Sequence, residues 1–125
     1  MTLNVAISGI ALFSYHLDKT AEFYNALGLH LQKSIHGWGP KYSYLDIIEK
    51  DGQRVFFEIH EASLEKVNFV NLKFEVDNVG ETLQKLITKS ALVERPKNKK
   101  FRHLTTIAVV QDPDGRSVQL NQRKK

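Results

Sequence analysis

The sequence of 125 residues contains no cysteine, which excludes disulfides, thiolate metal sites and cysteine nucleophiles. It also lacks any apolar run near the roughly 20 residues that span a bilayer, so no transmembrane helix is expected. The first residues, Met1-Thr2-Leu3-Asn4, have neither the basic segment nor the long apolar stretch of a signal peptide. We therefore expect a cytoplasmic protein, and the length fits one domain, residues 1–125, with its own hydrophobic core.

Positive charge is concentrated in two places. The chain has 18 Lys and Arg against 14 Asp and Glu, yet half of the basic residues fall in an acid-free stretch and near the carboxyl end. These residues are Arg95, Lys97, Lys99, Lys100, Arg102, Arg116, Arg123, Lys124 and Lys125. Only Phe101 interrupts the first cluster, so no aromatic platform for bases is indicated. We interpret both clusters, Arg116 included, as solvated and predict no nucleic-acid or membrane partner.

Hydrophobic patterning in the first half predicts a strand, a helix and three further strands. Residues Asn4–Ser14 are mostly apolar, which favours a strand buried on both faces. A helix follows, with Asp18 as its N-cap and Gly28 at its end. The three later strands are expected at about Leu29–His36, Tyr42–Ile48 and Gln53–His60.

The second half repeats this order. Alternating apolar and polar residues predict a strand at Phe69–Val76 with one buried face, and Asn78 with Glu81 has the spacing of a capping box. The apolar residues at helical spacing are Val79, Leu83, Leu86 and Ile87. Further strands are expected at about Leu92–Arg95, Leu104–Gln111 and Arg116–Asn121, the last two joined by the turn Asp112-Pro113-Asp114-Gly115.

The two halves form an internal repeat, because the helix-capping Asp77 lies 59 residues after Asp18. A repeat of this length predicts an α+β protein built from two β-α-β-β-β modules side by side, with the helices on one face. Module one is expected at about residues 1–62 and module two at about residues 67–125.

Two segments resemble a known family. The segment HLDKTAEFYNALGLHLQK resembles the opening Asp-Leu…Phe-Tyr-x-x-x-Leu-Gly motif of the vicinal oxygen chelate superfamily, and QDPDGRSVQL resembles its closing Asp-Pro-Asp-Gly motif. This superfamily includes glyoxalase I, extradiol dioxygenases and the bleomycin-resistance proteins. The resemblance implies a cupped, eight-stranded mixed sheet with helices on its outer face, a ligand in the cup and a homodimer.

In the metal-using members of that superfamily, four side chains facing the cup hold a divalent ion. The resemblance places these positions at Gly9, Glu58, Asn71 and Gln119, and only Glu58 keeps the usual residue. One carboxylate, two neutral amides and a glycine are a poor donor set for zinc, nickel or iron. We therefore predict a degenerate site and no cofactor, with His60 as the residue through which a divalent metal could still be held.

Strand alternation predicts which side chains face the cup. They are Ile7, Gly9, Ala11, Phe13, Phe56, Glu58, Asn71, Lys73, Glu75, Ser117 and Gln119. An apolar surface with a few polar groups is typical of a small-molecule site. The proposed ligand contacts are Phe13, Phe56, Asn71, Lys73 and Gln119, with Trp38 from a glycine-flanked loop and Tyr42 from the third strand.

The function has two alternatives. The first is a non-catalytic protein that binds a small, partly apolar ligand in the cup. The second is a lyase or isomerase, metal-assisted or metal-independent, that uses Glu58 as a general base beside a carbonyl group. A competing interpretation of Glu58 is that it only neutralises Lys73.

Overall fold

The computed structural model describes residues 7–35, 42–62, 67–87, 92–93 and 104–123. The first half contains β1 (Gly9–Ser14), α1 (Leu17–Leu27), β2 (Gln32–Ile35), β3 (Tyr42–Lys50) and β4 (Gln53–Glu61). The second half contains β5 (Leu72–Val76), α2 (Val79–Ile87), β6 (Leu92–Val93), β7 (Leu104–Gln111) and β8 (Ser117–Arg123). The predicted α+β order of elements is confirmed. No helix in the described part is long and apolar enough to cross a bilayer.

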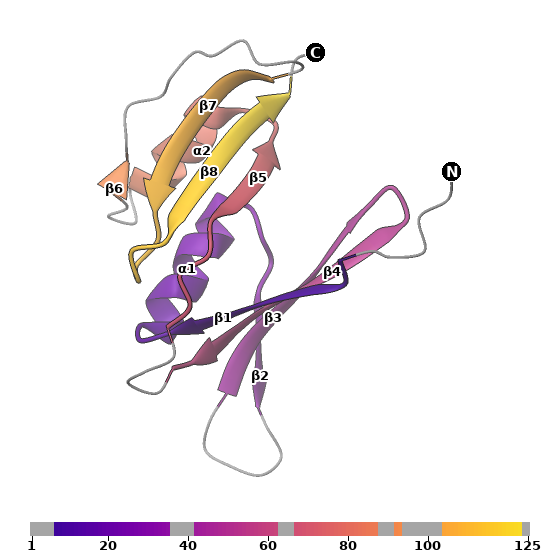
Figure 1. Cartoon of the computed structure of the whole chain (residues 1–125), viewed down its shortest axis with the longest axis vertical. Coiled ribbons are helices and arrows are strands. Elements are labelled where there is room, and N and C mark those ends of the chain that lie inside the picture. The colour runs from indigo at the N-terminus through magenta and orange to yellow at the C-terminus, as the bar shows by residue number, and fades with distance from the viewer. Residues whose placement is uncertain (1–6, 36–41, 63–66, 88–91, 94–103, 124–125) are drawn as a thin grey trace.

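The strands form two mixed sheets of four strands each. Their orders are β1-β4-β3-β2 and β5-β8-β7-β6, so each half has the same topology, with its first strand parallel to its last. Within the described residues no strand pairing joins the two sheets, whereas the family resemblance implied one eight-stranded sheet. Figure 1 shows the sheets at an angle, with β5, β8 and β7 in the upper part of the view, β1, β3 and β4 in the lower part, and α1 alongside both.

One hydrophobic core joins the two halves. The ring of Tyr24 on α1 lies 5.2 Å from that of Phe57 on β4 and 6.2 Å from that of Phe74 on β5, measured between centroids. The helices α1 and α2 also contact each other. The three aromatic side chains therefore hold both sheets against the helices by burying apolar surface.

The predictions for the helix ends are confirmed in part. Gly28 ends α1 with a φ of 138°, where a glycine is favoured. The N–H of Glu81 donates to Asn78 Oδ1 at 2.9 Å, which confirms Asn78, rather than Asp77, as the cap of α2. The prediction for Asp18 is wrong, because α1 begins at Leu17 with His16 in the N-cap position and no side-chain cap.

The prediction that the first strand is buried on both faces is also wrong. Leu12 and Ser14 are fully buried, whereas Gly9 and Ala11 are exposed. β1 is therefore buried on the helix side alone. We call the opposite side of each sheet its helix-free face.

Candidate functional site

The helix-free face of the first sheet brings together several predicted site residues. β1 and β4 pair in parallel with Ala11 opposite Glu58 and Phe13 opposite His60, so these four side chains share a face. Leu12, Phe57 and Ile59 alternate with them and are buried in the core.

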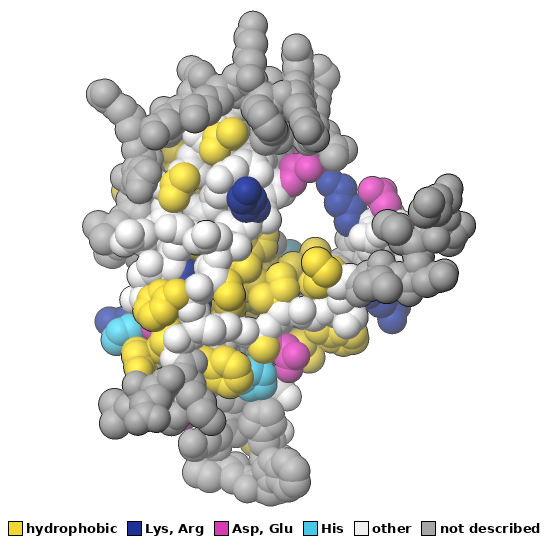
Figure 2. Space-filling view, viewed as in Figure 1, with side chains coloured by type: hydrophobic (Ala, Val, Ile, Leu, Met, Phe, Trp, Pro, Cys, Tyr) yellow, Lys and Arg dark blue, Asp and Glu magenta, His cyan; other side chains and the backbone are white. Residues whose placement is uncertain are grey.

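This face is apolar around its acidic residue. Phe56 and Ile47 are opposite each other on β4 and β3, and each exposes about two fifths of its surface. Gly9 pairs with Phe56, and Leu45 pairs with Glu58. Figure 2 shows hydrophobic side chains gathered in the hollow between the two sheets. A carboxylate beside flat apolar surface is the composition of a small-molecule site.

Glu58 pairs with His60 rather than with Lys73. The distance from His60 Nε2 to Glu58 Oε1 is 3.3 Å, and the two side chains come from the same strand, two residues apart. The His60 ring is stacked on Phe13, with centroids 5.6 Å apart and an angle of 29° between the rings. The interpretation that Glu58 merely neutralises Lys73 is therefore wrong for the described part of the chain. His60 is the penultimate residue of β4 (Gln53–Glu61), so it lies near the end of the strand.

The second sheet presents a more polar helix-free face. Lys73 on β5 is opposite Gln119 on β8, and Glu75 is opposite Asn121. Gln119 Nε2 donates to Asn121 Oδ1 at 2.7 Å. Lys73 is exposed and Gln119 is half-buried. Besides the acidic Glu75, the described part of this face offers the ammonium of Lys73 and neutral amides, which are suited to oxygen atoms of a ligand.

The four positions that correspond to metal ligands in the superfamily do not fit a divalent ion. Glu58 and His60 together supply two donors, the amide of Gln119 is bonded to Asn121, and Gly9 has no side chain. A Cβ at Gly9 would meet only ordinary contacts, the nearest at 3.5 Å. The position therefore has room for a Cβ but carries no donor atom. No group of three or more His, Asp or Glu suited to a metal occurs among the described residues. A divalent ion therefore has no adequate donor set here.

Tyr42 does not join the other predicted ligand contacts. Tyr44 is opposite the buried Ile59, so it and Tyr42 lie on the helix side of the sheet. Both hydroxyls donate to Asp18, Tyr42 at 2.8 Å and Tyr44 at 2.7 Å, and these bonds lower the pKa of Asp18. Burial and the Asp18 contact raise the pKa of Tyr44 to about 12. The two tyrosines tie β3 to α1, and Trp38 lies outside the described residues.

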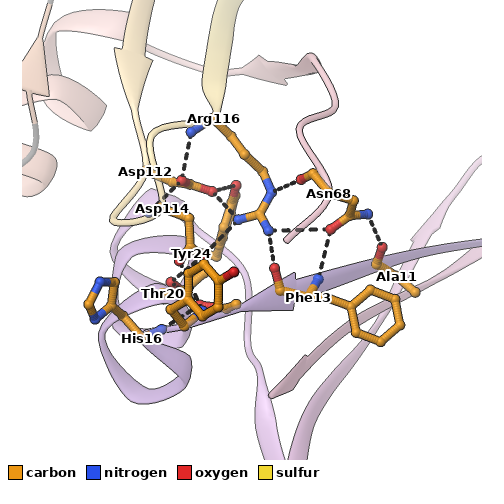
Figure 3. A network of polar contacts seen from close by, with 11 residues as sticks. Ala11, Phe13, His16, Thr20, Tyr24, Asn68, Asp112, Asp114 and Arg116 are labelled. Atoms are coloured by element: carbon orange, nitrogen blue, oxygen red, sulfur yellow. Dashed lines mark hydrogen bonds and ion pairs between the residues drawn. The ribbon is translucent and has the colours of Figure 1, made fainter. Parts of the chain in front are cut away.

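Sequence reasoning missed a buried ionic cluster centred on Arg116. The solvated interpretation of this residue is wrong, because Arg116 is only 1 % exposed. Its Nη1 lies 2.9 Å from an oxygen of Asp112 and 2.9 Å from one of Asp114, and all three side chains are shielded from solvent. Figure 3 shows this cluster between the turn that precedes β8 and the edge of β1.

The cluster extends into α1. Tyr24 donates to Asp112 at 2.7 Å, and burial strongly raises the Tyr24 pKa. Burial alone would lower the pKa of Arg116, but the two carboxylates outweigh it and raise the pKa. The guanidinium therefore stays charged. The signal in the sequence was the placing of two acidic residues two and four positions before Arg116.

Comparisons with known proteins agree with this fold. The antibiotic-binding protein TnmS3 from a Streptomyces species has a similar structure, with a TM-score of 0.70 and 18% identity over 98% of this chain and 100% of that one. A glyoxalase family protein from Bacillus cereus has a TM-score of 0.63 and 14% sequence identity, and the match covers 100% of this chain and 97% of that one. A glyoxalase I variant from Zea mays has a TM-score of 0.71 and 16% sequence identity. That match covers 92% of this chain but only 46% of the longer maize chain.

These identities show a common fold and no more. No curated protein sequence matches the chain significantly. The family model for the Glyoxalase/Bleomycin resistance protein/Dioxygenase superfamily, however, matches residues 6–120. The motifs, the repeated topology and this match over nearly the whole length agree, and the chain belongs to the glyoxalase/bleomycin resistance protein/dioxygenase superfamily.

Proposed function

We propose that the protein binds a small, partly aromatic molecule between the helix-free faces of its two sheets. The observation that carries this proposal is the unequal chemistry of the two faces. The first offers Phe13 and Phe56 as flat apolar surface, and the second offers Lys73 and Gln119 as polar partners. TnmS3, which has the same fold, is described as an antibiotic-binding protein.

The ligand class follows from these side chains. Aromatic rings gain most from covering Phe13 and Phe56, and each such contact contributes roughly 1–3 kcal/mol. A carbonyl, carboxylate or hydroxyl oxygen on the same molecule would be bound by Lys73, Asn71 and Gln119. A polycation is disfavoured, because the exposed ammonium of Lys73 would repel it.

Binding can be tested with 2-naphthoate, which combines two aromatic rings with a carboxylate. We expect amide shifts in ¹H–¹⁵N spectra along β1, β4 and β8, and a dissociation constant roughly tenfold larger in Phe56→Ala and in Lys73→Ala. The uncharged 2-naphthamide should bind more weakly than 2-naphthoate and should respond less to Lys73→Ala, because a neutral carbonyl accepts a weaker hydrogen bond from the ammonium than a carboxylate does. Ile35→Ala is the control, because Ile35 is an exposed apolar residue that pairs with Tyr42 and so lies on the other face. Equal binding in wild type, Phe56→Ala and Lys73→Ala would refute this site.

The contact between Glu58 and His60 favours a second candidate, an isomerase or lyase without a metal. In that reaction the Glu58 carboxylate takes a proton from the carbon beside a carbonyl, and the electron pair forms an enolate. His60, 3.3 Å away, is placed to exchange the proton with solvent.

Exchange of the methyl protons of 2-acetonaphthone in D₂O, followed by ¹H NMR, tests this candidate. Protein-dependent exchange that disappears in Glu58→Gln would support it. An exchange rate equal to that in buffer would leave ligand binding as the only proposed function.

The open sheet faces also support a homodimer. Ile7 and Phe69 expose 75% and 71% of their surface, and Phe56 lies on the helix-free face. Apolar groups of this kind are commonly covered by a partner or a ligand. A second copy of the chain would shield the hollow between the sheets from water.

A further inference from the structure

The free edge of β1 is satisfied by side chains from the second half of the chain. β1 pairs with β4 along one edge and is the outer strand of its sheet, so the peptide groups on its other edge need partners. Asn68 supplies two of them. The N–H of Phe13 donates to Asn68 Oδ1 at 2.8 Å, and Asn68 Nδ2 donates to the carbonyl oxygen of Ala11 at 2.8 Å. One carboxamide thus replaces the donor and acceptor of a neighbouring strand.

Arg116 fixes this carboxamide and also binds the carbonyl group of Phe13, the third group on the free edge. Its Nε donates to the main-chain oxygen of Asn68 at 2.7 Å, and its Nη2 lies 3.3 Å from Asn68 Oδ1. Nη2 also donates to the carbonyl oxygen of Phe13. The two buried carboxylates of Asp112 and Asp114 hold the guanidinium in place. The N–H and the carbonyl oxygen of Phe13 are therefore both held by residues of the second half (Figure 3).

Phe13 connects this junction to the candidate ligand site. Its ring lies on the helix-free face and stacks on His60, which contacts Glu58. A movement of the Phe13 backbone would displace the ring and remove the surface that limits rotation of the imidazole.

We propose that Asn68, held by Arg116, is a positioning residue of this site: it sets the place of Phe13 and, through the stacked rings, the orientation of His60 beside Glu58. Residues outside the helix-free face thereby determine the shape of the ligand-binding surface. The consequence for ligand binding rests on the proposed function, whereas the consequence for the His60 ring does not.

The test compares Asn68→Ala with Asn25→Ala. Asn25 is a matched control, because its Oδ1 accepts the N–H of Leu31 at 2.7 Å and it is in contact with neither Phe13 nor His60. The first readout is the chemical shift of the His60 ring protons, which the ring current of Phe13 perturbs. His60→Gln identifies these resonances among the five histidines.

We expect Asn68→Ala to move the His60 ring shifts towards those of Phe13→Leu, and Asn25→Ala to leave them at the wild-type values. In the Phe13→Leu background, Asn68→Ala should cause no further change. The dissociation constant of 2-naphthoate should rise about three- to tenfold in Asn68→Ala, because the contact with Phe13 would be weakened and not removed. If Asn68→Ala does not fold, Asn68→Ser replaces it, because a hydroxymethyl group is too short to bridge both peptide groups.

Wild-type His60 shifts in folded Asn68→Ala or Asn68→Ser would overturn the proposal. Equal changes in Asn25→Ala would also overturn it, since they would indicate a general loss of stability. If wild type does not bind 2-naphthoate while Asn68→Ala still moves the His60 shifts, the positioning role stands and the proposed function fails.

Discussion

Replacing Arg116 by methionine tests how strongly the buried cluster stabilises the fold. The substitution keeps an unbranched apolar stem and removes the guanidinium, which bonds to Asp112, Asp114, Asn68 and Phe13. The two carboxylates would then be buried without their cation. Removing one partner of a buried ion pair costs about 3–5 kcal/mol. The free energy of unfolding of an ordinary domain is about 5–15 kcal/mol, so the loss is roughly a fifth of the total or more.

Arg54→Met is the matched comparison. Arg54 Nε lies 2.8 Å from Glu49 Oε1, as close as the pairs of Arg116, but the two side chains are 69% and 57% exposed. An exposed pair contributes about 0–1 kcal/mol, because water already solvates both charges. Burial, and not distance, should therefore separate the two variants.

The assay is urea-induced unfolding of both variants, and linear extrapolation gives their free energies of unfolding. The two values can be compared if the m-values of the variants are similar. Arg116→Met should lose at least about 2 kcal/mol more than Arg54→Met. Equal losses within experimental error would refute the conclusion that the Arg116 cluster is shielded from water and holds the two halves together.

Three further predictions follow from the site and the junction. Calorimetric titration with Zn²⁺ should show no sub-micromolar site in wild type; tight binding that disappears in Glu58→Gln would contradict the degenerate donor set. Sedimentation at micromolar concentration should give a dimer, and a species of 14.3 kDa would contradict it. Although burial alone would raise the pKa of Asp114, its bonds to Ser14, Arg116 and the N–H of Tyr15 hold that pKa below 3.8. Its contribution to stability should therefore be present above about pH 4 and be lost as the pH falls further; Asp114→Asn should show a weaker acid dependence in urea unfolding than wild type.

Much of the fold could be predicted because its signals are local. Alternation along β4 placed Phe56 and Glu58 together, and the structure puts both on the helix-free face. The same signal was ambiguous on β3, where both alternate sets contain apolar residues and tyrosine is common on either face. Tyr42 was accordingly expected beside the ligand, whereas its hydroxyl lies against Asp18.

Arg116 could not be predicted by the same reasoning. A charged residue directly after a turn is usually exposed, and pattern rules assign it to solvent. Its burial depends on partners from three other places: the end of β1, the segment before β5 and the turn that contains Asp112 and Asp114. These contacts span up to 103 residues, and no periodicity reports them. The pairing of Glu58 with His60 lies between these cases. The spacing of two placed both side chains on one face, but the interpretation considered Lys73 as the partner of Glu58, whereas the structure has His60.

The loss of metal ligands changes what must hold the two halves in register. In the metal-using members of the superfamily, the ion is bound by side chains from both modules and so links them at the ligand site. Here Gly9, Asn71 and Gln119 provide no such link. The described connections are the Tyr24 core, Arg116 with Asn68 and the largely exposed ion pair of Lys50 with Glu75. Because the buried contacts of Tyr24 and Arg116 lie outside the helix-free faces, we expect that side chains on those faces can change without separating the modules. We expect the same arrangement to make the junction sensitive to acid, through Asp114.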